Sequence, residues 1–177
     1  MPQKIQNQLT EFISKEKIAK RVTQIAKQIN KDYKGKKPIF IGILNGSFIF
    51  LSDIIREVKI ECEIDFLKLS SYGDEKITSG KVKMLKELNC EIKGRDIIVV
   101  EDIVDSGLSA IFIKKLIEKH KPASLKFMTL LFKKNISNLK FKIDYIGFEI
   151  ENKFVVGYGL DYAQKYRNLK AVYVLNC

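Results

Sequence analysis

The stretch IIVVEDIVDSGLSA, residues 97–110, decides the fold. Its first four residues form an unbroken apolar run, which is typical of a strand that is buried on both faces of a sheet. Three carboxylates follow, Glu101, Asp102 and Asp105, and then small residues that allow an anion to approach the backbone. A helix is predicted from Ser106 onward, and the N–H groups at its beginning attract anions. The stretch therefore predicts a strand, loop and helix that combine carboxylates with an anion site.

Apolar runs and amphipathic segments alternate along the rest of the chain. Helices are predicted at 15–31, 48–58 and 106–120, and strands at 39–44, 59–70, 82–88, 96–101, 125–132, 143–150 and 171–175. Strands that alternate with helices imply an α/β fold with a parallel sheet and right-handed crossovers. Ligands of such sheets bind beyond the carboxyl ends of the strands, which is where Asn45, Gly46 and Lys133 are expected.

The composition indicates one cytoplasmic domain. A chain of 177 residues with 46% hydrophobic content can build a single core, and no repeat or Pro/Gly-rich linker divides it. Cys62, Cys90 and Cys177 are an odd set without CxxC spacing, which argues against a disulfide framework and a structural zinc site. The first ten residues contain no apolar signal segment, and no apolar run approaches the roughly 18 residues of a membrane span. We therefore expect no membrane partner.

The formal net charge of +11 allows two interpretations. A basic chain can bind nucleic acid or another polyanion, or it can simply carry a solvated, lysine-rich surface. The lysines are spread along the whole chain, and no basic stripe interleaved with aromatic residues occurs. The second interpretation is therefore favoured, nucleic acid is not expected as a partner, and a phosphorylated small substrate is compatible with the charge.

The carboxylates of residues 101–105 also allow two interpretations. They can cap the following turn, or they can accept hydrogen bonds from a diol, bind Mg²⁺ and exchange a proton. A substrate that carries a phosphate, a sugar diol and a magnesium-bound pyrophosphate would use all of these functions beside the anion site. A Walker phosphate loop is excluded, because the chain contains no GxxxxGK[ST] segment.

The segment VEDIVDSGLSA, residues 100–110, resembles the signature of phosphoribosyltransferases, which bind 5-phosphoribosyl pyrophosphate. Three other segments resemble the hypoxanthine (hypoxanthine-guanine) branch of this purine/pyrimidine phosphoribosyltransferase family: IGILNGSFIFLSDIIR at 41–56, DFLKLSSYG at 65–73 and KFVVGYGLDYAQKYRNL at 153–169. The resemblance implies a type I phosphoribosyltransferase-like (Rossmann-like) parallel sheet flanked by helices. It further implies one domain over 1–177, with a core at about 35–150, a small hood from 1–15 and 151–177, and a mobile loop at 71–80.

The resemblance implies a purine salvage enzyme, a hypoxanthine phosphoribosyltransferase of the pentosyltransferase class. Such an enzyme transfers the 5-phosphoribosyl group from 5-phosphoribosyl 1-pyrophosphate to hypoxanthine, and to guanine as a second base, to give IMP or GMP and pyrophosphate. Mg²⁺ is the implied cofactor, and a homodimer or homotetramer is the implied assembly. The alternative is a non-catalytic RNA-binding regulator on the same fold, which the net charge motivates. Lys133 and the segment FVVGYGLD favour the enzyme, because a regulator has no need of a 6-oxopurine pocket.

By this resemblance, the carboxylates divide between the sugar and the base. Glu101 and Asp102 would face the ribose hydroxyls and a magnesium ion, and Asp105 would be the catalytic general acid/base at purine N7. The residues that would wrap the 5-phosphate, largely through backbone N–H groups, are Ser106, Gly107, Leu108 and Ser109.

Three further groups complete the expected site. Pyrophosphate would be bound by Asn45, Gly46 and Arg167, with a non-proline cis peptide between Leu44 and Asn45. The purine would be bound by Ile103, Lys133, Phe154, Val155, Leu160 and Asp161. Asp161 would also hold a second magnesium ion. Ser71 and Tyr72, in the closing loop, would exclude water from the reacting centre.

Two of these positions allow another interpretation, and a third differs from the usual residue of the family. Taken alone, Lys133 is a solvated lysine at a strand end and Phe154 is a core residue. The resemblance makes Lys133 the donor to the purine 6-oxo group, since an ammonium has donors only and would reject the amino group of adenine. Many family members have Lys where this chain has Asn45, so one positive charge is absent from the expected pyrophosphate site.

Overall fold

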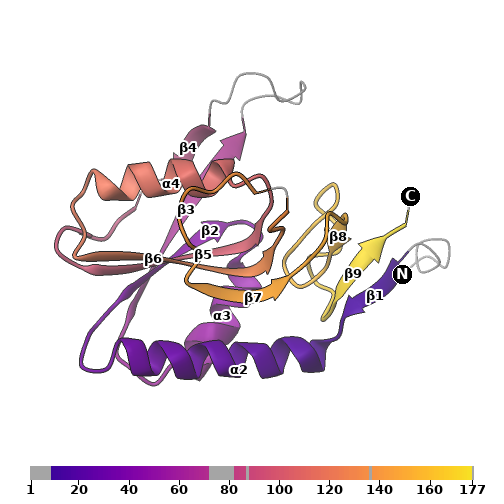
Figure 1. Ribbon diagram of the computed structural model, residues 1–177, viewed down its shortest axis with the longest axis horizontal. Helices are drawn as coiled ribbons and strands as arrows, with labels where there is room; N and C mark the ends of the chain where they lie inside the picture. Colours follow the sequence, from indigo (N-terminus) through magenta and orange to yellow (C-terminus); the bar gives the residue numbers. More distant parts are fainter. Residues whose placement is uncertain (1–8, 72–81, 87, 136, 177) are drawn as a thin grey trace.

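A six-stranded sheet with helices on both faces and a separate three-stranded sheet form the computed structural model, which describes residues 9–71, 82–86, 88–135 and 137–176 (Figure 1). Ser71 ends a strand of the large sheet, whereas Tyr72 and the rest of the expected closing loop lie outside the described residues. No helix among the described residues is both long enough and apolar enough to cross a membrane.

The large sheet has the strand order β4-β3-β2-β5-β6-β7. Its strands are β2 (Ile39–Leu44), β3 (Glu63–Ser71), β4 (Val82–Lys86), β5 (Asp96–Val104), β6 (Ser124–Phe132) and β7 (Tyr145–Glu149). Only the β3–β4 pair is antiparallel, and the other four pairs are parallel, which confirms the predicted parallel sheet. The predicted bounds of β2 are those of the structure.

Strand β5 extends further than the sequence predicts. The prediction ended the strand at Glu101, but β5 continues to Val104, because Ile103 and Val104 pair with Leu131 and Phe132 of β6. Glu101 and Asp102 therefore lie within the strand and not in the loop that follows it.

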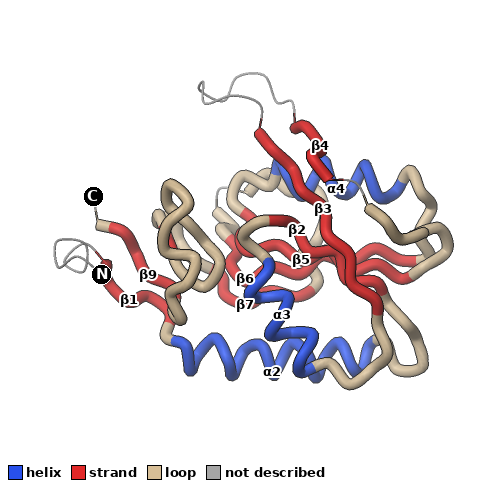
Figure 2. The backbone as a smooth tube through the Cα atoms, turned by 180° about the vertical axis from the view of Figure 1, so that it is seen from behind, coloured by secondary structure: helices blue, strands red, loops and turns tan. Residues whose placement is uncertain are grey.

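Helices α2 (Lys15–Asp32), α3 (Phe48–Glu57) and α4 (Leu108–Glu118) cover the sheet, with α2 and α3 on one face and α4 on the other (Figures 1 and 2). The strands between them are buried on both faces. Phe40 and Ile98 pack in the core under α2 and α3, while Ile41 and Val99 pack in the core under α4. Two-sided burial is the reason that these strands read as continuous apolar runs.

Helix α4 begins two residues later than predicted. The prediction began the helix at Ser106, but Gly107 has φ +85°, which is left-handed backbone that does not belong to an α-helix. Ser106 and Gly107 therefore form a turn between β5 and the helix, and the first helical residue is Leu108.

The small sheet joins the two ends of the described chain. Its order is β1-β9-β8, with β1 (Leu9–Ile13) antiparallel to β9 (Val172–Leu175) and β9 antiparallel to β8 (Val155–Val156). Figure 2 shows β1 and β9 side by side, apart from the large sheet. Strand β9 was predicted, whereas β1 and β8 were not.

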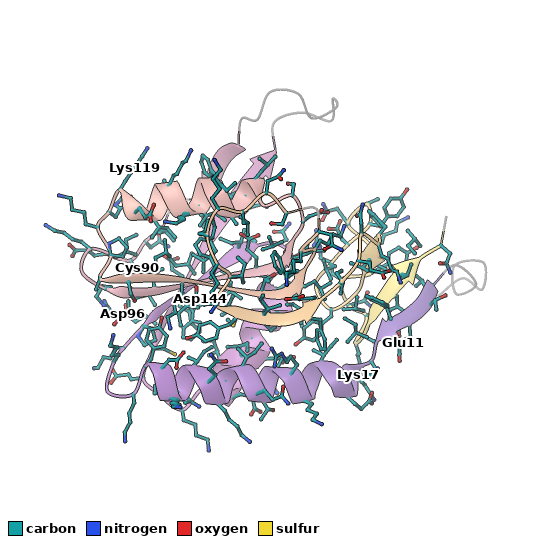
Figure 3. All side chains as sticks on the ribbon, in the orientation of Figure 1. Glu11, Lys17, Cys90, Asp96, Lys119 and Asp144 are labelled. Atoms are coloured by element: carbon teal, nitrogen blue, oxygen red, sulfur yellow. The ribbon has the colours of Figure 1, made fainter. Side chains whose placement is uncertain are left out.

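Lysines lie on opposite sides of the molecule. Lys17 on α2 and Lys119 at the end of α4 are both exposed, and their side chains point away from the sheet on its two different faces (Figure 3).

Helix α2 also closes one edge of the large sheet. The guanidinium of Arg21 donates to the backbone carbonyls of Ile146 and Gly147 in edge strand β7, at 2.6–3.1 Å. These bonds fix the helix to the edge strand of the sheet. Gly147 is itself required for the pairing with β6, since a Cβ at this position would lie 2.2 Å from the Leu130 carbonyl oxygen.

We therefore predict that Gly147→Ala lowers the free energy of unfolding by about 2–4 kcal/mol, because the clash is with backbone and not with a movable side chain. Gly35→Ala is the matched control. Gly35 has φ +75° but no atom within 4 Å of an added Cβ, so only the left-handed conformation opposes alanine, at about 1 kcal/mol. Urea denaturation of both variants measures the difference, and equal losses would contradict the steric explanation.

Candidate active site

The carboxyl ends of β5 and β6 meet the segment 153–161 around a pocket of about 210 Å³. Eight of its nine lining residues were predicted as site residues: Asp102, Ile103, Asp105, Lys133, Phe154, Val155, Leu160 and Asp161. The ninth, Lys153, was not predicted. It lies inside the quoted segment 153–169, but nothing in the pattern separates it from the other surface lysines. The structure thus brings the expected base-binding residues together with the carboxylates of β5.

Lys133 is not a solvated lysine. Only 6% of the residue is exposed, and its Nζ lies 2.8 Å from Asp105 Oδ2 and 3.2 Å from Asn152 Oδ1. Its backbone N–H donates to the Val104 carbonyl at 3.0 Å, which continues the pairing of β5 with β6 by one step. The ion pair therefore stands at one wall of the pocket, with the half-exposed Asp105 carboxylate facing outward.

Phe154 is not a core residue either. Its side chain is 51% exposed, whereas its neighbours Val155 and Leu160 are buried at 7% and 5%. The ring makes an edge contact with Tyr162, with the centroids 5.7 Å apart. One aromatic face at the pocket is therefore available for stacking on a flat ligand.

Glu101 is a buried carboxylate without a complete set of partners. It is 5% exposed, and its Oε1 has no hydrogen-bond donor. Burial, and to a lesser extent the charge of Asp102, raises its pKa to about 8. Burial likewise raises the pKa of Asp102 to about 6, although the backbone N–H groups of Ile103 and Asp102 and the charge of Arg167 oppose the shift. Both acids are therefore easier to protonate than free carboxylates.

The segment at Asn45 packs directly on Asp102 through Gly46. The peptide between Leu44 and Asn45 is cis, as predicted. A Cβ on Gly46 would lie 1.6 Å from Asp102 Oδ2, and a Cβ on Gly159 would lie 2.1 Å from the Gly46 carbonyl oxygen. Only glycine fits at this approach of two loops and a carboxylate. The backbone of Gly46 is thus held between the end of the large sheet and the segment that follows β8.

Arg167 lies beside Gly159 and Asp161. It donates to the Gly159 carbonyl at 2.8 Å and forms an ion pair with Asp161 at 2.7 Å. Gly159, as described, packs on Gly46. The three residues expected at the pyrophosphate, Asn45, Gly46 and Arg167, are therefore linked through Gly159, a contact that the sequence did not reveal.

The turn at Ser106 and Gly107, where an anion site was predicted, lies between β5 and the first residue of α4. Its backbone is fixed from two sides, since the Ser106 carbonyl accepts from Asn138 N at 3.1 Å and a Cβ on Gly107 would meet Leu139 at 2.8 Å. The first turn of α4 contains no acidic residue, so its N–H groups face no competing charge on the helix.

The donor set suits magnesium. Mg²⁺ prefers carboxylate oxygens, and it usually combines one or two of them with water and substrate phosphates. The unpartnered Oε1 of Glu101 and the neighbouring Asp102 meet this requirement. Within the described residues, no three His, Cys, Asp or Glu side chains are arranged to bind one ion together.

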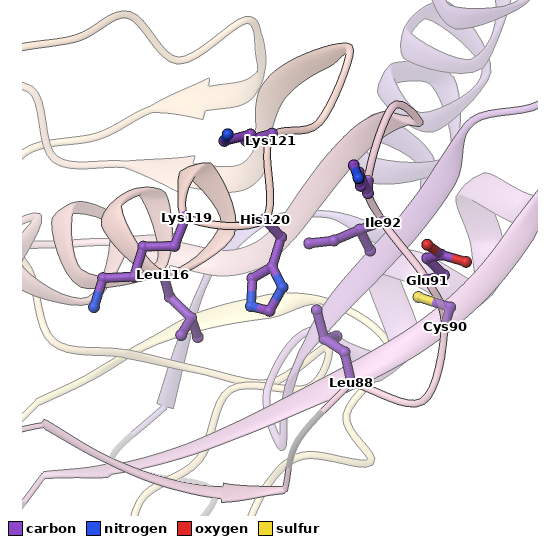
Figure 4. Close-up of a pocket in the computed structure, with 9 residues that line it drawn as sticks. Leu88, Cys90, Glu91, Ile92, Leu116, Lys119, His120 and Lys121 are labelled. Atoms are coloured by element: carbon purple, nitrogen blue, oxygen red, sulfur yellow. The ribbon is translucent and has the colours of Figure 1, made fainter.

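A larger cavity, of about 590 Å³, lies at the end of α4 and the segment that precedes β5. Figure 4 shows His120, Ile92, Leu116 and Leu88 around it. It contains none of the predicted site residues and no paired carboxylates. Cavity size alone would therefore have pointed to the opposite end of the sheet from the predicted site residues.

Residues 8–163 match the model of the phosphoribosyl transferase domain family. The chain is 42% identical over 164 residues to the hypoxanthine-guanine phosphoribosyltransferase of Bacillus subtilis, which covers 93% of this chain and 91% of that protein. A solved hypoxanthine-guanine phosphoribosyltransferase from Bacillus anthracis superposes with a TM-score of 0.89 at 44% identity, over 94% of this chain and 98% of that one. The bifunctional protein TilS/HprT of Listeria monocytogenes is 40% identical over 164 residues, and this chain covers 93% of its own length but only 25% of that relative.

We predict that Glu101→Gln stabilises the ligand-free protein at pH 8, by on the order of 4 kcal/mol. The folded-state pKa of Glu101 is raised, so the unfolded chain releases this proton at a lower pH than the folded chain does. The contribution of Glu101 to the free energy of unfolding is therefore fully present below about pH 4.5, and it is lost as the pH rises toward 8. Gln carries no charge, so the variant escapes this loss.

Chemical denaturation in the presence of a metal chelator, at pH 4.5 and pH 8, measures the effect. The exposed Glu57→Gln is the control and is expected to behave as wild type at both pH values. A gain for Glu101→Gln that is equal at both pH values would exclude the buried charge as its cause.

Proposed function

We propose that this chain, which belongs to the phosphoribosyl transferase domain family, transfers the 5-phosphoribosyl group of 5-phosphoribosyl 1-pyrophosphate to a 6-oxopurine. Hypoxanthine and guanine are the proposed acceptors, and IMP or GMP and pyrophosphate are the products. The relatives and the solved structure described above carry names for this activity.

One observation carries the proposal: a buried ammonium and a half-exposed carboxylate, Lys133 and Asp105, meet at 2.8 Å beside an exposed aromatic ring. A purine that stacks on Phe154 would place its edge at this pair. Lys133 would then donate to the 6-oxo oxygen, and the Val155 backbone would contact the base edge. An amino group at C6 would meet a donor instead of an acceptor, which excludes adenine.

Asp105 would carry the proton at purine N7. As N9 attacks C1 of the sugar, the N7 proton of the neutral base leaves, and the Asp105 carboxylate accepts it. Lys133 must release Asp105 for this step, and the incoming 6-oxo oxygen replaces the carboxylate as an acceptor of the ammonium. The ion pair of the free protein is thus exchanged for two contacts with the base.

The other end of the site would hold the sugar donor. Ser106, Gly107, Leu108 and Ser109 would bind the 5-phosphate, and Asn45, Gly46 and Arg167 would bind the pyrophosphate. Glu101 and Asp102 would accept hydrogen bonds from the ribose diol, and they would hold one magnesium ion while Asp161 holds a second. Bound magnesium supplies charge neutralisation for the departing pyrophosphate. The chain's own part is to position the two substrates in line and to exclude water.

The remaining expectations complete the proposal. The small sheet would form a hood over the base. The protein would act in the cytoplasm as a homodimer or homotetramer. These statements rest on the family resemblance.

The direct test mixes the protein with hypoxanthine, magnesium and 5-phosphoribosyl pyrophosphate and measures the formation of IMP. Product is expected with hypoxanthine and guanine and not with adenine. An absence of product together with tight RNA binding would instead favour a non-catalytic regulator on this fold.

Replacement of Asp105 tests the proton step. We expect Asp105→Asn to lower kcat by roughly 10²-fold or more, because an amide cannot accept the N7 proton. The dissociation constant of the sugar donor, measured by calorimetry, should change by less than about threefold, since Asp105 lies at the base and not at the phosphates. Equal losses in turnover and in donor binding would contradict the role of Asp105.

A further inference from the structure

Lys133 has more donors than the proposed chemistry at the base accounts for. Its ammonium carries three N–H groups. Two described acceptors contact it, Asp105 Oδ2 at 2.8 Å and Asn152 Oδ1 at 3.2 Å, and the side chain is only 8% exposed. A buried ammonium needs such partners, because solvent can reach little of it. The second acceptor, Asn152, has no role in the chemistry proposed above.

The two acceptors differ in what happens to them when a base binds. Asp105 lines the pocket, and in the proposed reaction it leaves Lys133 to take the N7 proton. Asn152 does not line the pocket, so a base that enters does not displace it. Asn152 is therefore the acceptor that Lys133 can keep throughout the reaction.

Asn152 also lies in a segment that is tied to both sheets. On one side, Ile150 N donates to the Phe132 carbonyl at the end of β6, at 2.9 Å. On the other side, the Phe154 carbonyl accepts from Leu175 N of β9, at 3.1 Å. Lys133 contacts this segment at Asn152, which is two residues before Phe154 in the chain. It joins the group that would donate to the 6-oxo oxygen to the backbone that carries the stacking face.

From this geometry we infer that Asn152 is a positioning residue for the base. It holds the Lys133 ammonium in the wall of the pocket, and it sets the distance between that ammonium and the ring of Phe154. Recognition of the base depends on both groups, because a flat 6-oxopurine must stack and accept a hydrogen bond in one pose. The inference rests on the proposed function, and it assigns to Asn152 an effect on the base alone.

Three variants test the inference. Asn152→Ala removes the acceptor, and we expect it to raise KM for hypoxanthine about fivefold to tenfold, while KM for 5-phosphoribosyl pyrophosphate and the melting temperature stay unchanged. Asn152→Asp keeps an oxygen at the same place, and it is expected to return KM for hypoxanthine to within about twofold of wild type. Asn135→Ala, an exposed position near Lys133, is the control and should match wild type.

The outcomes separate this inference from the proposed function. Wild-type protein that forms no IMP overturns both. If wild type is active, an unchanged KM for hypoxanthine in Asn152→Ala overturns the positioning role alone. A parallel rise of both KM values with a lower melting temperature also overturns it, since it would show a merely structural residue. Failure of Asn152→Asp to rescue would show that an acceptor for Lys133 is not what the position supplies.

Discussion

The parallel pairing of β5 with β6 is the constraint on which the rest of the structure depends. It runs from Asp96 opposite Ser124 to Val104 opposite Phe132, and the bond from Lys133 N to the Val104 carbonyl extends it by one step. Because the two strands end at the same level, the next residues of each, Asp105 and Lys133, come within ion-pair distance. If one strand were shifted by one residue against the other, Asp105 and Lys133 would lie on opposite faces of the sheet and could not form an ion pair.

The same pairing explains why Glu101 is buried. The carboxylate lies inside a strand between β2 and β6, at a depth where most strands carry apolar side chains. Burial of an acid without full hydrogen bonding is unfavourable, and it raises the pKa of Glu101. A protein keeps such a group where a ligand can satisfy it. The stability of the ligand-free chain is thus lowered at the place where a cation and a diol would bind.

The second constraint is the close approach of backbone to backbone at Gly46. Asp102 packs on one side of this glycine and Gly159 on the other, and Arg167 fixes the Gly159 carbonyl. The small sheet and the large sheet therefore meet at a point where no side chain fits. The segment that would carry the base and the loop that would carry the pyrophosphate are in direct contact at this point.

The sequence by itself determined the buried strands, the three helices and the identity of most groups at the pocket, because hydrophobic periodicity and short motifs are local properties. The last residues of β5 escaped prediction, since their pairing with β6 defines them, and strands β1 and β8 were not predicted from their own residues. Only the tertiary structure decided that Lys133 is buried beside Asp105, that Phe154 is exposed, and that Asn152 contacts the ammonium. These facts depend on how separate elements lie against one another, and burial and hydrogen bonding across a fold are not encoded in the spacing of residues along it.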